Sequence, residues 1–203
     1  MRATERKQLM ALNNKPFHKT KQHLIDVMND MLRHATIEDI TIKALVQEAD
    51  VTRSTFYTYY SDKYALFEDL IAQCNRQIYF ALRYVPAHFS SLEVRKRIYD
   101  NTWQVLTTIY SYKHIFSQIN PEIRVKILEQ EIHSFKPLLV QQFKYLKVNA
   151  SVDADILATF YLSGIISTYN LWIANNFSMP IEELCEQVTD LTMTIYSGYI
   201  DKE

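Results

Sequence analysis

A run of hydrogen-bonding side chains occupies residues 52–59, which read TRSTFYTY. Phe56 and Tyr60 stand four residues apart, as on the inner face of a short helix, and Thr52 is placed to cap its start. The Arg, Ser, Thr and Tyr side chains around them are left to face outward. A guanidinium pairs with a guanine edge through two hydrogen bonds, and hydroxyls bind phosphate oxygens. We therefore expect this helix to contact the base edges and phosphates of DNA.

Two further helices are expected to position this one. The residues before it form a short helix that Thr41 caps, with an apolar side made of Ile42, Leu45, Val46 and Ala49. The chain turns at Asp50, and a third helix begins at residues 61–62 with Lys63 in its first turn. Two short helices joined by a tight turn form a helix-turn-helix. The alternative is a plain helical hairpin of a bundle, which does not explain the polar and aromatic outer face.

The stretch from residue 40 to 66 resembles the DNA-binding domain of the TetR family of bacterial transcriptional regulators. The positions that fit the family pattern are Thr41, Val46, Ala49, Val51, Thr52, Ser54, Thr55, Phe56, Tyr57, Tyr59, Tyr60, Asp62, Lys63 and Leu66. The chain departs from the pattern at two positions. Asp50 replaces the Gly of the turn, where we expect a left-handed backbone, and Tyr60 replaces a Phe, which puts a hydroxyl near the small core.

The residues of this stretch divide by their expected contact with DNA. The candidates for base edges or the nearby backbone are Lys43, Arg53, Ser54 and Thr55. The candidates for phosphate contacts are Thr41, Tyr57, Tyr59 and Lys63, with Thr52 at the start of the reading helix. We expect double-stranded DNA with a palindromic operator as the partner.

The composition indicates a helical protein. The chain has 203 residues, of which 48% are hydrophobic, with only two Gly and five Pro, and this argues against β-sandwiches and long loops. Residues 1–63 carry 10 Lys/Arg against 8 Asp/Glu, a net of +2, and residues 64–203 carry 12 against 15, a net of −3. The positive net charge of the N-terminal part favours DNA contact at that end of the chain.

The compartment is predicted from cysteines and hydropathy. Cys74 and Cys185 lie far apart in apolar patterns, as buried free thiols of a reducing compartment do. No apolar run approaches transmembrane length, and the N-terminus has no signal-peptide core. We expect a cytoplasmic protein that does not enter a membrane.

The predicted fold class is all-α, in four segments. Residues 1–16 form a flexible basic arm, and residues 17–63 a three-helix domain of helix-turn-helix type. Residues 64–86 form a linking helix, and residues 87–203 a larger helical domain for regulation and dimerisation. Within the last segment, Pro121 opens a helix that Pro137 interrupts or kinks, and further helices begin near residues 151–153 and 178–180.

Residues 161–184 read YLSGIISTYNLWIANNFSMPIEEL and resemble the C-terminal domain of a TetR-family branch common in low-GC Gram-positive bacteria. That resemblance implies a homodimer through the last two helices. Small residues around Gly164 permit close helix approach, although packing within one chain would use them equally. The predicted interface residues are Tyr161, Gly164, Ile165, Thr168, Trp172, Leu184, Val188, Leu191 and Ile195.

Aromatic residues between the predicted helices offer a lining for a ligand pocket. The candidates are Trp103, Tyr110, Phe116, Phe135, Phe143, Phe160 and Tyr169, and an ordinary helical core would show the same spacing. Such a lining favours an apolar or aromatic effector over an anion. The six His are scattered, and no zinc, phosphate-loop or nucleophile-elbow pattern is present, so we expect no metal, no cofactor and no enzyme activity.

The resulting functional hypothesis is a homodimeric regulator, with repression as the family's usual sign, whose residues 87–203 respond to an effector. The alternative is a co-activator of the same fold that docks another protein and uses no small molecule. An enzyme is the third and weakest reading. The sequence does not specify the effector, the operator or the regulated genes.

Overall fold

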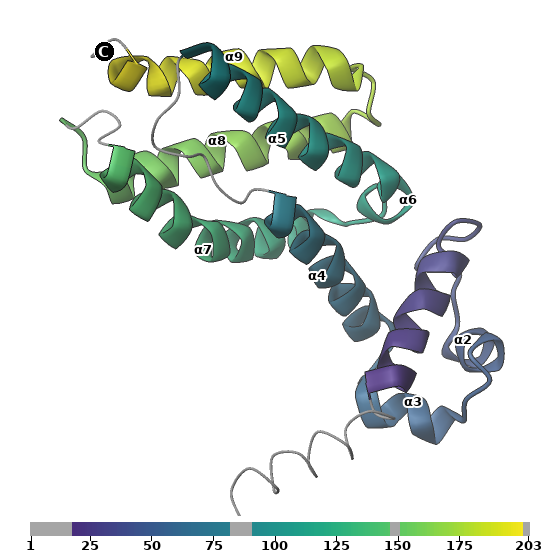
Figure 1. Ribbon diagram of the computed structural model, residues 1–203. Helices are drawn as coiled ribbons and strands as arrows, with labels where there is room; N and C mark the ends of the chain where they lie inside the picture. Colours follow the sequence, from purple (N-terminus) through teal and green to yellow (C-terminus); the bar gives the residue numbers. More distant parts are fainter. Residues whose placement is uncertain (1–17, 82–90, 147–150, 201–203) are drawn as a thin grey trace, which may run out of the picture. The chain divides into compact units, whose positions relative to one another are not determined.

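The computed structural model describes residues 18–81, 91–146 and 151–200, and every element within these ranges is helical (Figure 1). This confirms the all-α prediction. The chain divides into two compact units, Met1–Gln73 (unit 1) and Cys74–Glu203 (unit 2). The division falls inside α4 (Lys63–Ala81), within the segment predicted as a linking helix. The predicted basic arm over residues 1–16 and the end of the linking helix, residues 82–86, lie outside the described residues.

Unit 1 contains a first helix over residues 18–31, then α2 (Ile42–Glu48), α3 (Arg53–Tyr59) and the first part of α4. Side chains from all four helices meet in one core and are almost inaccessible to solvent: Leu24, Met28, Leu45, Phe56 and Leu66. The small core thus depends on apolar residues spaced three or four apart along short helices.

The turn between α2 and α3 has the left-handed residue that the sequence predicts, because Asp50 adopts a φ of 48°. The amide of Val51 donates to the carbonyl of Val46 at 3.0 Å, and the amide of Asp50 donates to Gln47 at 3.2 Å. These two bonds form a Schellman motif, which closes a helix C-terminus and redirects the chain sharply. The motif therefore sets the angle at which α3 leaves α2.

Side-chain caps begin the three helices that surround this turn. The Thr41 hydroxyl accepts the amide of Ala44 at 3.1 Å, and the Thr52 hydroxyl accepts the amide of Thr55 at 3.0 Å. The Asp62 carboxylate accepts the first amides of α4 at 2.9 and 2.8 Å. Both predicted threonine caps are thus present, each satisfying an amide that the helix leaves unpaired.

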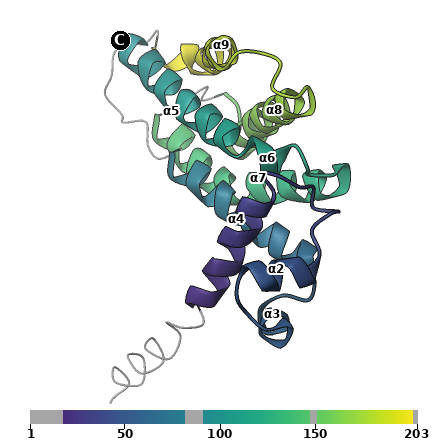
Figure 2. The same cartoon turned by 90° about the vertical axis from the view of Figure 1, so that its right-hand side faces the viewer.

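Unit 2 contains α5 (Ser91–Ser111), α6 (Lys113–Phe116), α7 (Pro121–Leu146), α8 (Ala154–Ala174) and α9 (Ile181–Ile200). Helix α5 packs along α9 and α7 packs along α8, as both views show (Figure 1 and Figure 2). A core cluster draws Val94 and Ile98 from α5, Phe143 from α7, Leu157 and Ala158 from α8, and Tyr196 from α9. Pro121 opens α7 as predicted. The helix continues through Pro137 and does not restart there.

The connection between α8 and α9 is a second Schellman motif, with Asn176 and Phe177 at φ values of 52° and 57°. The amide of Phe177 donates to the carbonyl of Trp172 at 2.9 Å, and the two rings pack edge to face at 4.9 Å. The Trp172 indole donates to the carbonyl of Met179 at 2.8 Å. Trp172 therefore fixes this connection from within its own chain.

Helix α8 corrects the expectation that no apolar run approaches transmembrane length. Its 21 residues, with a mean hydropathy of 1.3 over the most apolar window, are long and apolar enough to cross a membrane by those two criteria. One third of that window is buried inside unit 2, where α8 packs against α7. The helix is thus apolar on its solvent side as well as on its packed side.

Candidate nucleic-acid interface and internal cavity

Helix α3 separates its side chains into a buried and an exposed side. Phe56 is fully buried and Tyr60 is 6% exposed, so the predicted inner face is confirmed. Arg53, Ser54 and Tyr57 are exposed, as is Thr58. The exposed side therefore carries a guanidinium and hydroxyls on a helix held in place by two caps and a core aromatic residue.

Arg53 is oriented by the residue one turn further along α3. Its Nη2 donates to the Tyr57 hydroxyl at 3.3 Å, and the guanidinium carbon lies 5.7 Å from the centre of the Tyr57 ring. A guanidinium has five N–H donors, so this contact leaves others for a bidentate bond to a base edge. The pair restricts the Arg53 side chain on the exposed side of the helix before any ligand binds.

The hydroxyl candidates have mixed environments. Thr41 and Thr52 cap helices as acceptors, and an accepting hydroxyl retains its own proton as a donor for a phosphate. Thr55 is partly buried as a residue, and its hydroxyl lies 2.8 Å from that of Thr52. Lys43 is exposed on α2, and Tyr59 is partly buried on α3. Unit 1 thus brings the predicted residues to two short helices and their caps.

Lys63 is engaged within unit 1 in a way that the sequence did not suggest. Its ammonium donates to the carbonyl of Glu38 at 2.8 Å and to the carbonyl of Ile40 at 2.9 Å. Two of its three N–H groups therefore hold the turn before α2 against the start of α4. One N–H remains for the phosphate contact that was predicted for this residue.

The hydroxyl of Tyr60 has a partner that explains how the small core tolerates it. It donates to the Asp69 carboxylate at 2.9 Å, and Lys21 forms an ion pair with the same carboxylate at 2.7 Å. Burial, together with Asp69, raises the pKa of Tyr60, so the phenol stays protonated. The ammonium of Lys21 is thus engaged inside unit 1.

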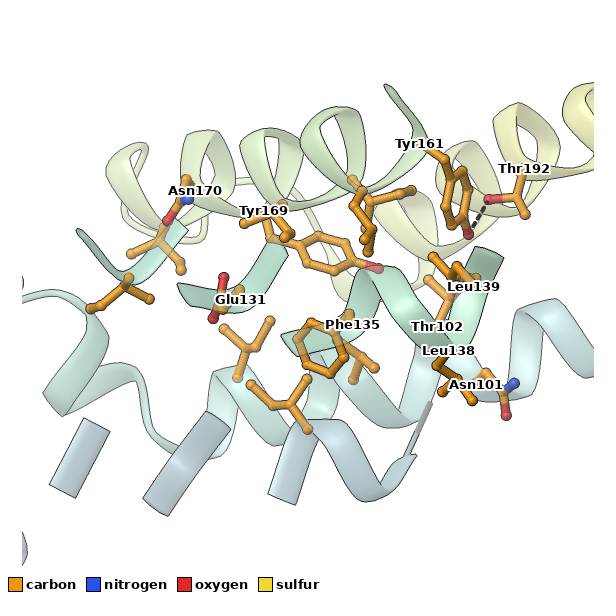
Figure 3. A pocket seen from close by; sticks show the side chains of 18 of the residues that line it. Asn101, Thr102, Glu131, Phe135, Leu138, Leu139, Tyr161, Tyr169, Asn170 and Thr192 are labelled. Carbon is orange, nitrogen blue, oxygen red and sulfur yellow. Dashed lines mark hydrogen bonds between the residues drawn. The ribbon is translucent and has the colours of Figure 1, made fainter. Parts of the chain in front are cut away.

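Unit 2 encloses a cavity of about 130 Å³ between α5, α7, α8 and neighbouring residues (Figure 3). Three of the predicted pocket aromatics line it: Phe116, Phe135 and Tyr169. The other four do not. Phe143 is in the core cluster, Trp103 stacks on Tyr99, Tyr110 packs on Trp172 and Phe177, and Phe160 is 74% exposed. Helical spacing thus identified which aromatic residues share a helix face, but it did not predict which of those faces border the cavity.

The polar residues of the cavity were missed. Glu131, Arg124 and Gln142 line it from α7, and Gln142 has a buried side-chain nitrogen without a hydrogen-bond partner within the described part of the chain. A signal was present in the sequence, because Glu131 stands four residues after Ile127 and four before Phe135. A carboxylate within an apolar helical stripe is unusual and marks a site or a buried pair.

The predicted dimer residues need correction. Trp172, Leu184 and Val188 are 4%, 4% and 1% exposed within the single chain, so they are core residues and not interface residues. Tyr161 and Ile165 line the cavity. The stripe on α9 packs on α5, which the spacing alone did not reveal. Of the other predicted interface residues, Gly164 and Leu191 are exposed, and Thr168 and Ile195 are partly buried.

Comparisons with known proteins agree with the helix-turn-helix geometry. Residues 29–70 match the family model described as bacterial regulatory proteins, tetR family. A curated relative, the uncharacterized HTH-type transcriptional regulator YxbF of Bacillus subtilis, is 28% identical over 165 residues, which are 79% of this chain. Residues 29–70 are therefore similar to the helix-turn-helix domain of the TetR family. The match covers α2, α3 and the turn between them, the segment in which the first resemblance implied a DNA-binding domain.

Solved TetR-family structures share the fold. A regulator from Streptomyces coelicolor has a TM-score of 0.65 at 15% identity, covering 92% of this chain and 84% of that chain. The repressor AlkX from Dietzia sp. strain DQ12-45-1b, implicated in biodegradation of n-alkanes, has a TM-score of 0.60 at 14% identity, covering 89% and 96%. At these identities the likeness shows the fold alone. The chain spans 41% of the length of YxbF.

Proposed function

We propose that this TetR-family protein is a homodimeric repressor whose two α3 helices enter successive major grooves of a two-fold symmetric operator in the cytoplasm. The exposed side of α3 carries this proposal, because Arg53 is oriented by Tyr57 while Phe56 fixes the opposite side in the core. Contacts to phosphates position such a helix, and contacts to base edges specify the sequence that it reads. Two copies are needed because one short helix reads only a half-site.

The solvent side of α8 supports the homodimer. Ile156, Phe160 and Leu171 are 65%, 74% and 62% exposed, and their spacing of four and eleven residues places them on one face. Gly164 lies on this α8 outer face, and a Cβ added there would meet no atom within 4 Å. A Gly inside a helix costs about 1 kcal/mol relative to Ala, and no described residue lies close enough to require it. A second copy that approaches α8 closely accounts for both observations.

The cavity in unit 2 supports regulation by a small molecule. A space of about 130 Å³ lined by Phe116, Phe135 and Tyr169 can hold an apolar or aromatic group. The rival hypothesis, a co-activator that only docks another protein, does not need such a space. If the dimer has two conformations that differ in DNA affinity, an effector that binds one of them more tightly shifts the population toward it. The change in DNA affinity is limited by the difference between the effector's affinities for the two conformations.

The test is binding of the purified protein to DNA from upstream of its own gene, followed by fluorescence anisotropy and footprinting. We expect a protected site with two-fold symmetry and at least a hundred-fold preference over random DNA of equal length. Equal binding to both DNAs would contradict the operator hypothesis. A protein that binds no DNA alone but joins another regulator on DNA would establish the co-activator alternative.

A further inference from the structure

Among the described residues that line the cavity, Glu131 is the only one with a carboxylate. It projects from α7 into the same space as Phe135, one turn away on α7, and Tyr169, which comes from α8 (Figure 3). Ile127 lies one turn before it on the same face. The carboxylate is therefore surrounded by apolar and aromatic side chains in a space that a ligand can enter.

No described residue forms a hydrogen bond or ion pair with the Glu131 carboxylate. The charged neighbour on the cavity wall, Arg124, lies two helical turns earlier on α7, about 10 Å along the axis. Its guanidinium donates to the carbonyls of Ile119 at 3.0 Å and Asn170 at 3.3 Å. Arg124 is thus held by backbone groups, and within the described part of the chain the negative charge of Glu131 has no compensating partner.

The missing compensation has a measurable consequence, because burial raises the pKa of Glu131 from 4.5 to about 7. An apolar environment disfavours the charged carboxylate unless an opposite charge accompanies it. A cation placed in the cavity would supply that charge. Aromatic faces such as those of Phe135 and Tyr169 also attract organic cations.

The size of the cavity limits the cation. Its volume of about 130 Å³ is close to that of an engineered cavity of about 150 Å³ that binds benzene. One aromatic ring, or an aliphatic group of similar volume, therefore fills the space. A metal ion would not, since the wall offers a single carboxylate and otherwise mostly apolar groups.

We propose that the cavity binds a small organic cation, a protonated amine on a single aromatic or branched apolar body, with the ammonium against Glu131. The proposal rests on the proposed function in taking this cavity as the effector site. An anion would be repelled by the carboxylate, and a purely apolar molecule would leave it unpaired. A neutral alcohol would donate one hydrogen bond but would not neutralise the charge.

The test uses three probes of nearly equal shape: benzylamine, benzyl alcohol and benzoate. Calorimetric titrations at pH 8 compare the wild type with Glu131→Gln and with Glu129→Gln, which makes the same change at an exposed position of α7. We expect wild type and Glu129→Gln to bind benzylamine at least ten-fold more tightly than benzyl alcohol, and benzoate the least. Glu131→Gln should bind the amine and the alcohol equally.

A second measurement needs no variant and holds even if Glu131→Gln folds poorly. Benzylamine stays protonated between pH 6 and pH 8, whereas Glu131 becomes ionised over that range. The other titratable groups that face the cavity do not change: burial raises the pKa values of Tyr161, Tyr169 and Tyr196, and Arg124 stays charged. Wild-type affinity for benzylamine should therefore rise several-fold from pH 6 to pH 8, and affinity for benzyl alcohol should not.

Three outcomes would overturn the proposal: equal binding of alcohol and amine by the wild type, an unchanged preference in Glu131→Gln, or no binding of any probe. Each is separate from the proposed function, because operator binding by the unliganded protein is measured without a probe. Loss of operator binding with intact amine binding would instead contradict the proposed function and leave the cation site standing.

Discussion

In unit 1 the solvent side of α3 exposes Arg53 and Tyr57, whereas in unit 2 the solvent side of α8 exposes Phe160 and Leu171. The two interiors differ in how their buried polar groups are hydrogen-bonded. In unit 1 the buried hydroxyl of Tyr60 is satisfied by Asp69. In unit 2 the Glu131 carboxylate faces the cavity, with no hydrogen-bond partner among the described residues. The buried side-chain polar atoms that lack a hydrogen bond among the described residues also all belong to unit 2.

This difference indicates which groups of each unit lack a partner within the described chain. Over its described residues, 18–73, unit 1 has no buried side-chain polar atom without a hydrogen bond, and α3 exposes polar side chains that we propose contact DNA. Unit 2 exposes an apolar helix face and encloses an uncompensated carboxylate, and both are costly. We propose that a second copy covers the apolar helix face and that an effector cation neutralises the carboxylate. The predictions below test each side of this contrast.

The largest expected effect is on the α8 outer face. Phe160→Glu places a carboxylate in an interface with no partner, which costs several kcal/mol and should convert the dimer to monomers at micromolar concentration. Leu92→Glu is the control, because Leu92 is 76% exposed on α5 and is not on that face. Sedimentation velocity measures both. A monomeric wild type, or two variants that behave alike, would remove the argument for this dimer.

The next effect concerns the stability of unit 2. The folded-state pKa of Glu131 is about 7 against 4.5 ordinarily, so folding favours the protonated acid and stability falls as pH rises through that window. Glu131→Gln removes this penalty. At ~1.4 kcal/mol per pKa unit, the variant should gain roughly 3 kcal/mol over the wild type at pH 8 and about 1 kcal/mol at pH 5. Urea unfolding at both pH values, with Glu129→Gln as control, would show a pH-independent difference if the carboxylate were already compensated.

A smaller effect is expected from Lys63 in unit 1. Lys63→Met removes the two hydrogen bonds to the carbonyls of Glu38 and Ile40 and should lower the free energy of unfolding by about 1–2 kcal/mol. Lys43→Met, at an exposed position of α2, should leave stability unchanged. Thermal denaturation compares the pair. Equal stability of the two variants would mean that Lys63 contributes only its charge.

The smallest effect is expected at the turn between α2 and α3. Because Asp50 holds a φ of 48°, Asp50→Gly should leave stability unchanged or raise it by about 0.5–1 kcal/mol. Asp50→Val should lower it by about 1 kcal/mol or more, since a β-branched residue resists this backbone. A clear loss of stability in Asp50→Gly, measured by chemical denaturation, would reveal a stabilising contact of the carboxylate.

Local signals in the sequence predicted the structure well where one or two neighbouring residues decide it. The caps at Thr41 and Thr52, the left-handed Asp50 and the helix start at Pro121 all depend on local backbone chemistry. The same reasoning explains the success for the exposed side of α3. Phe56 fills the buried side of this seven-residue helix, so Arg53, Ser54, Tyr57 and Thr58 are left on its exposed side.

Packing between helices that are far apart in the sequence was not predictable in the same way. Periodicity identified an apolar face on α9, but only the structure shows that Leu184 and Val188 are buried within the single chain, in a unit where α9 packs on α5. Helix α8 is apolar on all sides, so its sequence could not tell Trp172, which is buried, from Leu171, which is exposed. Glu131 was overlooked because its surroundings depend on side chains from the helices that pack around α7.

The most direct test of the central claim is operator binding by Arg53→Ala, with Arg97→Ala, an exposed arginine of α5, as a control of equal charge. The account predicts that Arg53→Ala loses about 1–3 kcal/mol of affinity for the operator and relaxes the preference at one base position per half-site. Arg97→Ala should bind as the wild type does. If Arg53→Ala keeps wild-type affinity and base preference, α3 does not read the DNA.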